Sequence, residues 1–399
     1  MPARRSWKPY KKSTEEQKLR FDKDNRFQIT VFGDLHFAED DKADKKTTGV
    51  MKNVLSSEKT DLVVLNGDLI SGDVTKRSNS TRYIDQIVAP LVDHGLPWAS
   101  AYGNHDSEIH LDSEELLREE KKHPGCLTQR SVSGSTAGVT NYYLPVFPHE
   151  TSNLNQSIPE LILWFFDSQG GHFPMAEDDH GESVPRQNWV DRTVVEWFTK
   201  ANDNLTTAYG KTIPSLAFTH IPVQAMRAFQ NSGVNPTHQP GIDAEKVHHQ
   251  GGDLPSGYRS QDFPFMQALL NTSGLAAVFS GHDHGNDWCF RWDDRLAGMN
   301  LTGSGVNLCY GRRTGYGGYG EWARGARQIL VDENSLRGDI RTWIRLEDGS
   351  KSGDVHLNST YGSDQYAIRG QGSAFSSQYL GFVYLWMVVI LGLSSGFGD

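Results

Sequence analysis

The feature that most constrains the fold is a repeated arrangement in which a short apolar run ends abruptly at Gly, Asp, Asn or His. Six such runs occupy residues 27–32, 62–65, 97–102, 161–166, 215–218 and 276–279. Short runs of this kind, rich in β-branched and aromatic residues, are typical of buried strands that lead into loops at one edge of a sheet. The sequence therefore predicts a sheet whose polar loops gather at one edge.

Helices are expected between several of these runs, because residues 48–58, 81–93 and 190–201 repeat apolar side chains every three or four positions. The first part thus reads β-α-β-α-β. Later runs at 307–310, 328–331 and 341–345 are separated by turn residues, and they predict a second sheet with antiparallel pairing. The expected fold class is α/β (α+β), a two-sheet β-sandwich flanked by helices on both sides. Residues 108–159 and 224–260 have few periodic runs and are expected to form long loops over the polar edge.

One folded domain is expected over residues 26–346, because a single core can be built from a chain of this size and composition. Residues 1–25 form a predicted basic tail, and residues 347–378 a predicted polar linker. Residues 379–396 form a hydrophobic segment whose apolar centre is shorter than the roughly 20 residues of a spanning helix. Two interpretations of it stay open, a membrane anchor and a hydrophobic tail.

Localisation signals in the sequence conflict. The first residues are basic and lack the apolar stretch of a secretory signal, which favours a cytoplasmic or membrane-associated protein. Six Asn-x-Ser/Thr triplets suit a lumenal or secreted protein, an alternative that requires an incomplete N-terminus. These triplets begin at Asn79, Asn155, Asn204, Asn271, Asn300 and Asn358.

Charge and cysteine usage narrow the functional classes further. A formal net charge of −10 argues against nucleic acid as the main partner, since phosphate backbones are normally bound by a basic face. The three cysteines, Cys126, Cys289 and Cys309, are too few for a disulfide framework. Free buried thiols are expected in preference to a single disulfide between Cys289 and Cys309.

Residues with metal-ligand chemistry stand at five of the strand ends. These motifs are Gly33-Asp34-Leu35-His36, Gly67-Asp68, Gly103-Asn104-His105-Asp106, Thr219-His220 and Gly281-His282-Asp283-His284. Two ligands one residue apart reach the same site only if the backbone bends, which we expect the preceding glycine to permit. Each motif alone has an ordinary explanation as a turn or a core histidine, but the five together predict one metal site. Carboxylate, imidazole and amide ligands without thiolate suit Mn, Fe or Zn.

The order of these motifs resembles the calcineurin-like metallophosphoesterase family, whose signature is D-x-H, G-D, G-N-H-[DE], H and G-H-x-H. Longer stretches such as PWASAYGNHD and GHDHGNDWC are similar to the fungal calcineurin-like phosphatases and to a related plant branch beside the purple acid phosphatases. The resemblance implies two divalent or trivalent metal ions. It assigns Asp34, His36, Asp68 and His284 to the first, and Asp68, Asn104, His220 and His282 to the second, with Asp68 bridging.

The activity that this resemblance implies is hydrolysis of phosphate monoesters, with phosphoproteins among the expected substrates, through attack by a hydroxide that bridges the metals. His105 is expected beside the substrate as a general acid or hydrogen-bond donor. Asp106 is expected either to orient that imidazole or to cap its loop. Two alternatives stay open, a phosphodiesterase acting on a nucleotide or lipid head group, and an inactive phosphoesterase fold that serves as a binding scaffold.

Two further features bear on the site. Purple acid phosphatases carry a tyrosine ligand three residues after the bridging aspartate, but this chain has Ser71 there, so no ferric–tyrosinate site is expected and the metal identity stays open. The segment 307–327 is rich in Gly, Tyr and Arg. Arg312 and Arg313 in it are expected either to bind substrate phosphate through bidentate donation or to lie on the surface of a glycine-rich hairpin.

Overall fold

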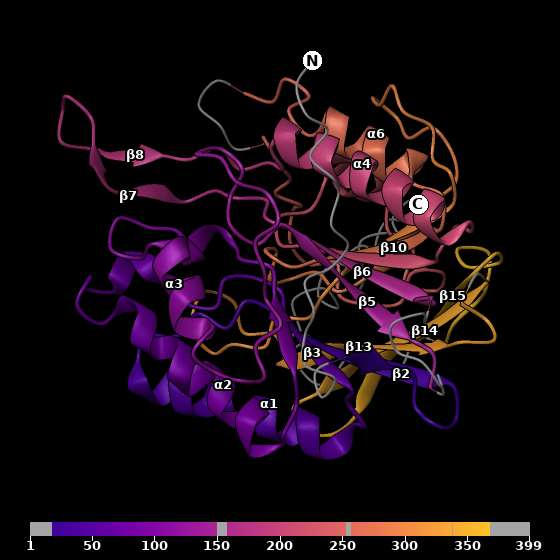
Figure 1. Ribbon diagram of the computed structural model, residues 1–399, viewed down its shortest axis with the longest axis horizontal. Helices are drawn as coiled ribbons and strands as arrows, with labels where there is room; N and C mark the ends of the chain where they lie inside the picture. The colour runs from indigo at the N-terminus through magenta and orange to yellow at the C-terminus, as the bar shows by residue number, and fades with distance from the viewer. Residues whose placement is uncertain (1–17, 150–157, 253–256, 337, 368–399) are drawn as a thin grey trace, which may run out of the picture.

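Two large sheets face each other in the computed structural model, which describes residues 18–149, 158–252, 257–336 and 338–367 (Figure 1). The first sheet has seven strands in the order β1 (Leu19–Arg20), β5 (Tyr142–Phe147), β6 (Leu161–Phe166), β9 (Ser215–Thr219), β10 (Leu275–Ser280), β12 (Val306–Tyr310) and β11 (Cys289–Trp292). The second has six, in the order β15 (Lys351–Asn358), β14 (Asp339–Leu346), β13 (Gly325–Asp332), β2 (Arg26–Phe32), β3 (Leu62–Leu65) and β4 (Trp98–Ser100).

Helices cover the outer faces of both sheets, which confirms the expected four-layer α/β/β/α architecture (Figure 1). The helices are α1 (Asp41–Ser57), α2 (Tyr83–Asp93) and α3 (Ser113–Glu120) beside the second sheet, and α4 (Arg192–Tyr209), α5 (Gln224–Ser232) and α6 (Phe263–Asn271) beside the first. Short 3₁₀ turns within the described ranges occupy Gly72–Val74, Ser80–Arg82 and Asn104–Asp106. Apolar side chains of the inner strand faces fill the space between the sheets, where the rings of Phe165, Phe218 and Phe279 stack in sequence.

Parallel pairing brings the polar strand ends to one edge. In the second sheet β2, β3 and β4 run parallel, and in the first β6, β9, β10 and β12 do. The carboxyl ends of parallel strands point the same way, so the loops that follow them meet. This arrangement confirms the predicted strands at the six apolar runs, and it places the ligand motifs between the two sheets.

Several details of the predicted topology were wrong. The strand β12 pairs with β10 in the first sheet, whereas β13 and β14 join β2 in the second, so the three late strands do not form one separate sheet. The stretches expected to be long loops contain α3, β5 and α5. An apolar run indicates that a strand forms but not which strand pairs with it. The alternating apolar pattern of β5 was overlooked because the sequence before it is rich in glycine.

The domain extends beyond the predicted limits at both ends. Strand β15 forms an edge of the second sheet inside the stretch interpreted as a polar linker, and the buried Leu19 and Phe21 lie inside the predicted tail. The hydrophobic segment 379–396 lies outside the described residues. Among the residues that the structure describes, no helix combines the length and apolar character that crossing a membrane requires.

The cysteine expectation was also wrong, because Cys289 and Cys309 form a disulfide. They are direct partners in the antiparallel pairing of β11 with β12. The third cysteine, Cys126, is free and buried. The sequence spacing of the two paired residues gives no sign of this register.

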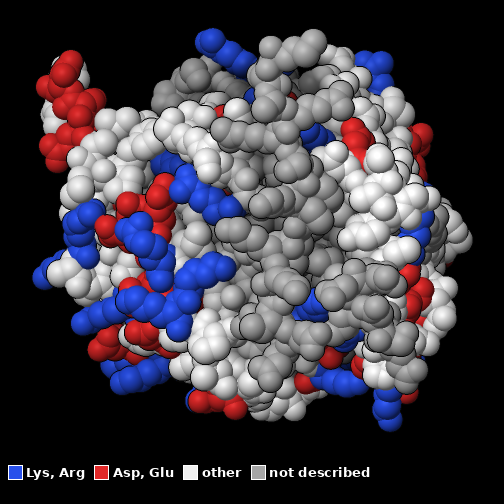
Figure 2. All heavy atoms as spheres, viewed as in Figure 1, with Lys and Arg blue, Asp and Glu red and all other residues white. Residues whose placement is uncertain are grey.

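A two-stranded hairpin, β7 (His172–Glu177) and β8 (Ser183–Pro185), projects from the body of the protein (Figure 1). Figure 2 shows acidic side chains gathered at its tip, at the upper left of that view. The exposed acidic residues there are Glu177, Asp178, Asp179 and Glu182. The backbone N–H of His172 donates to the carbonyl of Ser107, which joins the base of the hairpin to the loop that carries His105.

Candidate metal centre

The five strand-end motifs meet at the polar edge and form two adjacent groups of ligand atoms. The first group is Asp34, His36 and His284, and the second is Asp68, His220 and His282. Within each group the ligand atoms lie within 4.8 Å of one another. Each group combines residues that follow strands of both sheets, so the site depends on how the two sheets face each other.

The backbone bends at the candidate ligands themselves. Asp34, His36, Asp68 and His282 have positive φ angles of 54°, 49°, 50° and 77°. Such angles are uncommon for residues other than glycine and are concentrated at functional sites, where the surrounding structure holds the strain. The expectation that the preceding glycines provide the bend holds only for Gly67, with φ 85°, and not for Gly33, Gly103 or Gly281.

Two of these glycines are required because a candidate ligand side chain lies very close to their backbone. A Cβ atom on Gly67 would lie 2.3 Å from the Nδ1 atom of His220, and one on Gly103 would lie 2.3 Å from an Oδ1 atom of Asp68. Both distances are far below van der Waals contact. Gly67 therefore lets a loop of the second sheet pack against a candidate ligand of the first, and Gly103 lets two loops of the second sheet pack against each other.

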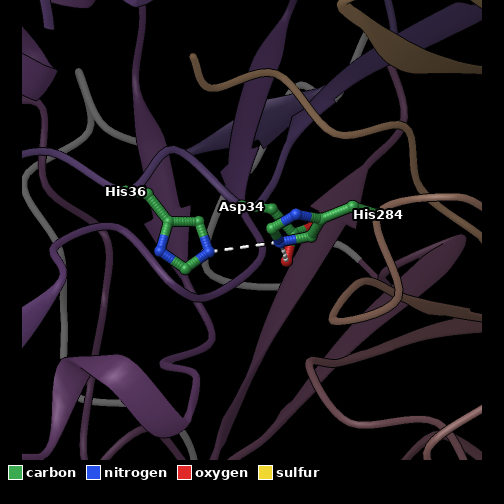
Figure 3. A group of neighbouring side chains, drawn as sticks. All are labelled: Asp34, His36 and His284. Atoms are coloured by element: carbon green, nitrogen blue, oxygen red, sulfur yellow. Dashed lines mark hydrogen bonds and ion pairs between the residues drawn. The ribbon is translucent and has the colours of Figure 1, made fainter. Parts of the chain in front are cut away.

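The first group presents two imidazole nitrogens to each other (Figure 3). The Nε2 atoms of His36 and His284 are 3.2 Å apart, and His284 Nε2 is 3.7 Å from Asp34 Oδ1. His284 Nδ1 donates to the carbonyl of Tyr319 at 3.0 Å, and His36 Nδ1 lies 2.8 Å from Ser71 Oγ. With the protons on Nδ1, both Nε2 lone pairs face the same point, as ligands of one cation would.

The protonation state of the two histidines in the first group favours metal binding. Burial lowers the pKa of His36 to about 4, and burial together with the neighbouring His36 lowers the pKa of His284 to about 2. Both imidazoles are therefore neutral near pH 7. Neutral imidazole is the form that binds metal.

The second group contains buried polar atoms that lack hydrogen bonds. His220 Nδ1 bonds the carbonyl of Asn66 at 2.9 Å, which leaves Nε2 pointing inward. Among the described residues, no hydrogen-bond partner reaches His220 Nε2, His282 Nδ1 or Asn104 Oδ1. Buried polar atoms without hydrogen bonds are costly, and the ligand atoms of Asp68, His220 and His282 lie within 4.8 Å of one another, as those of a cation site would.

The Asp68 carboxylate faces both groups. Its Oδ1 accepts from the backbone N–H of His105 at 2.9 Å. Its Oδ2 is 3.0 Å from His220 Nε2, without hydrogen-bond geometry, and 3.8 Å from His36 Nε2. One carboxylate oxygen of Asp68 therefore lies between imidazole nitrogens of the two groups.

His105 lies half-buried beside the first group, with its ring centroid 5.1 Å from that of His36. Its Nδ1 atom is 3.5 Å from Asp73 Oδ1 and 4.0 Å from Glu108 Oε1. Burial alone would lower the pKa of His105, but the carboxylates of Asp68, Asp73 and Glu108 raise it to about 9. The imidazole is therefore a cation near neutral pH and can donate a proton.

Asp106 does not orient that imidazole. Its carboxylate accepts the backbone N–H groups of Leu69, Ile70 and Gly103 at 2.9–3.1 Å. The contacts fix the loop after Asp68 against the loop that carries His105. This geometry contradicts the catalytic interpretation of Asp106 and agrees with the alternative of a loop cap.

Arg312 and Arg313 were also placed wrongly by the sequence, since both side chains are buried. Arg312 forms an ion pair with the buried Asp287 at 2.6 Å and donates to the carbonyl of Ala323. Arg313 donates to the carbonyls of Gly317 and Gly320. Both guanidinium groups stabilise the glycine-rich loop from inside, and neither is presented to a substrate phosphate.

The glycine-rich loop folds over the metal edge. The ring of Tyr319 stacks on His284, with centroids 4.0 Å apart and planes at 14°. Tyr319, Ser71, Glu39, Asp73 and Glu108 all contact candidate ligands or His105 and were missed as functional residues. Proximity to a motif was the only available signal for Glu39 and Asp73.

A third cluster, Glu245, His248 and Asp283, also lies near this edge. Its acceptors already have protein partners, because Asp283 accepts from His248 and from the hydroxyl of Tyr310, while Glu245 accepts from Gly285 N–H and from the hydroxyl of Tyr319. These contacts hold the loop that carries His282 and His284. They give the cluster a supporting role.

The chain is similar to several known proteins. A relative in Arabidopsis thaliana named probable inactive purple acid phosphatase 29 is 30% identical over 368 residues, covering 85% of this chain and 87% of the relative. Phosphatase DCR2 of Saccharomyces cerevisiae is 30% identical over 356 residues, covering 85% of this chain and 57% of that protein. A dimetal phosphatase from Danio rerio aligns with a TM-score of 0.47 and 13% identity over 83% of this chain and 98% of that one.

The model of the calcineurin-like phosphoesterase family matches residues 27–286. This stretch is more than half of the chain, and it contains every strand-end motif from Asp34 to His284. The protein therefore belongs to the calcineurin-like phosphoesterase family.

Proposed function

We propose that the protein hydrolyses phosphate monoesters at a centre of two metal ions, with phosphoproteins among its substrates. The observation that carries the proposal is the position of Asp68 Oδ2, between His220 Nε2 of one group and His36 Nε2 of the other. In this proposal Asp34, His36, Asp68 and His284 hold one ion. Asp68, Asn104, His220 and His282 hold the other, and the unpaired atoms of the second group support that assignment.

The chain's own residues have distinct tasks in this reaction. Two cations bound by these residues would lower the pKa of a coordinated water and neutralise charge on the phosphoryl oxygens. His105 turns Nδ1 toward Asp73 and Glu108, so its Nε2–H is the group that donates a proton to the leaving oxygen. Asp73 and Glu108 keep that imidazole protonated.

The acidic hairpin favours a small phosphate ester or a phosphoprotein as the substrate, in preference to a nucleic acid. Its base is joined to the loop of His105 through the bond from His172 N–H to Ser107 and through the contact of His172 Nδ1 with Glu108 Oε2 at 2.6 Å. Exposed acidic residues beyond it repel a polyanionic backbone. A basic segment beside a phosphorylated residue would be attracted.

An inactive scaffold is the second candidate, because the Arabidopsis relative is named as probably inactive. Loss of activity in this fold is expected to leave gaps in the ligand set or at the proton donor. This chain has a residue of the required type at every one of those positions, including His105. We therefore favour activity, in line with the name of the yeast relative.

The test measures phosphate release from a chromogenic monoester and from its diester analogue, together with bound metal, for wild type and His105→Ala. Loss of the proton donor should lower monoester turnover by roughly 10²–10⁴-fold while the bound metal is retained. His180→Ala, which removes an exposed histidine at the hairpin tip, should leave turnover unchanged. No turnover by metal-loaded wild type would support the scaffold, and a diester rate above the monoester rate would reject the monoester assignment.

A further inference from the structure

A chain of hydrogen bonds lies beneath the first ligand group and involves residues outside the family motifs. We infer that Glu39 and Ser71 position both histidines of that group, and thereby set the metal affinity of the first site without affecting the second. The inference rests on the proposed two-metal function. It identifies residues that set the metal affinity of one site, whereas the motifs identify only the residues that bind the metals.

The first link joins Ser71 to His36. Ser71 Oγ lies 2.8 Å from His36 Nδ1 and 2.5 Å from Glu39 Oε1. The imidazole donates from Nδ1 to the hydroxyl, and the hydroxyl donates to the carboxylate, which fixes the tautomer with a free Nε2 lone pair. Such a chain also increases the basicity of the metal-binding nitrogen. Ser71 is 1% exposed, so water does not compete for its hydroxyl.

The second link joins Glu39 to His284. The other carboxylate oxygen of Glu39, Oε2, accepts the backbone N–H of Gly318 at 2.6 Å. The next residue, Tyr319, accepts from His284 Nδ1 through its carbonyl and stacks its ring on that imidazole. One carboxylate therefore fixes the tautomer of His36 through Ser71, and the position of His284 through the glycine-rich loop.

The second ligand group has a different support. His220 bonds the backbone carbonyl of Asn66, which neither Glu39 nor Ser71 contacts. In the described part of the chain, neither Glu39 nor Ser71 forms a hydrogen bond or an ion pair with His282 or Asn104. Disrupting the pair should therefore weaken one metal ion selectively.

The experiment titrates the metal-free full-length protein with Mn²⁺ and measures the heat of binding by calorimetry. Wild type should show two binding steps. Ser71→Ala and Glu39→Gln should each weaken one step by about 10–100-fold, the usual effect of removing a group that orients a ligand, and leave the other step unchanged. Ser71→Thr keeps the hydroxyl and should restore much of the affinity. Asp41→Asn, the same kind of charge change at an exposed position nearby, should bind as wild type does.

A melting curve of each metal-free variant separates positioning from general stability. The inference is overturned if Ser71→Ala and Glu39→Gln both bind two ions as wild type does. It is also overturned if both steps weaken equally and the melting temperature of the metal-free protein falls with them. A wild type that binds no metal would instead reject the proposed function itself.

Discussion

The two ligand groups are built from similar residues but are held in different ways. In the first, His36 and His284 are oriented by Ser71 and by the carbonyl of Tyr319, which belong to loops outside the family motifs. In the second, His220 is oriented by the backbone of Asn66, directly before the Gly-Asp motif. The second group is thus held by the backbone next to a motif, whereas the first depends on one side chain, Ser71, and on the glycine-rich loop.

Their protonation differs as well. Burial lowers the pKa of His36 and of His284, so both imidazoles are neutral. Burial would also lower the pKa of His220, but the adjacent Asp68 raises it to about 10. A cation that enters the second group must therefore displace a proton from His220. In the first group the imidazoles carry no proton to displace, and only Asp34, whose pKa burial raises to about 7, is partly protonated near neutral pH.

The largest effect is expected from Asp68→Asn, which removes the one carboxylate shared by both groups. The amide cannot supply negative charge to either cation, so the distinction between the groups should disappear and both should lose affinity. Monoester turnover should fall by at least about 10³-fold, at the upper end of the effect of a lost electrostatic contact in an active site. Phosphate release and bound metal measure this, and turnover within tenfold of wild type would contradict a bridging role.

A smaller and selective effect is expected from Gly67→Ala. The added Cβ would lie 2.3 Å from His220 Nδ1, in a residue with φ 85°. Gly95→Ala is the matched control, because Gly95 also has a positive φ, 66°, but no atom within 4 Å of the added Cβ. Urea unfolding should show a loss of about 1–2 kcal/mol for the control and about 1–3 kcal/mol more for Gly67→Ala.

Metal titration extends this test, since Gly67→Ala should disturb the second group first. Gly95→Ala should leave both binding steps unchanged. If the two alanine variants lose equal stability and bind metal alike, the close packing of Gly67 on His220 does not matter, and the account of how the second group is held is wrong.

The smallest effect is a shift in pH dependence caused by Asp73→Asn. His105 must be protonated to donate, so activity is present below its pKa and is lost as the pH rises through it. Asp73 is one of the carboxylates that raise this pKa to about 9, against the opposing effect of burial. Its removal should move the alkaline limb of the pH–rate profile to lower pH.

Asp93→Asn is the control for that shift, because Asp93 is exposed and pairs with Lys52. It should leave the alkaline limb in place. Cations bound near Asp68 would offset part of the effect of the Asp68 carboxylate on the pKa of His105. The quantity to measure is therefore the difference between Asp73→Asn and Asp93→Asn in the pH of the alkaline limb. An alkaline limb at the same pH in wild type and Asp73→Asn would exclude His105 as the group that titrates there.

Much of the fold follows from local sequence. The runs before Asp34, Asp68 and His220 were predicted as strands because a buried strand needs a continuous apolar stretch, and the ligands stand where those stretches stop. Strand partners were not predictable in the same way. The placement of β12 and β15, and the register that pairs Cys289 with Cys309, depend on packing between distant segments.

The candidate site, like the fold, has features that the sequence predicted and features that it did not. The ligand types and their order were visible in the motifs, but the burial of Arg312 against Asp287 was not, since the chemistry that suits a phosphate also suits a buried carboxylate. Asp106 looked catalytic because it adjoins His105, yet its side chain turns to backbone N–H groups. Side-chain direction in a loop is set by tertiary contacts.

The most direct test of the central claim is the number of metal ions bound by the purified wild-type chain after reconstitution, measured by mass spectrometry. The two ligand groups joined by Asp68 predict two ions per chain. A chain that holds no stoichiometric metal under these conditions would contradict the account.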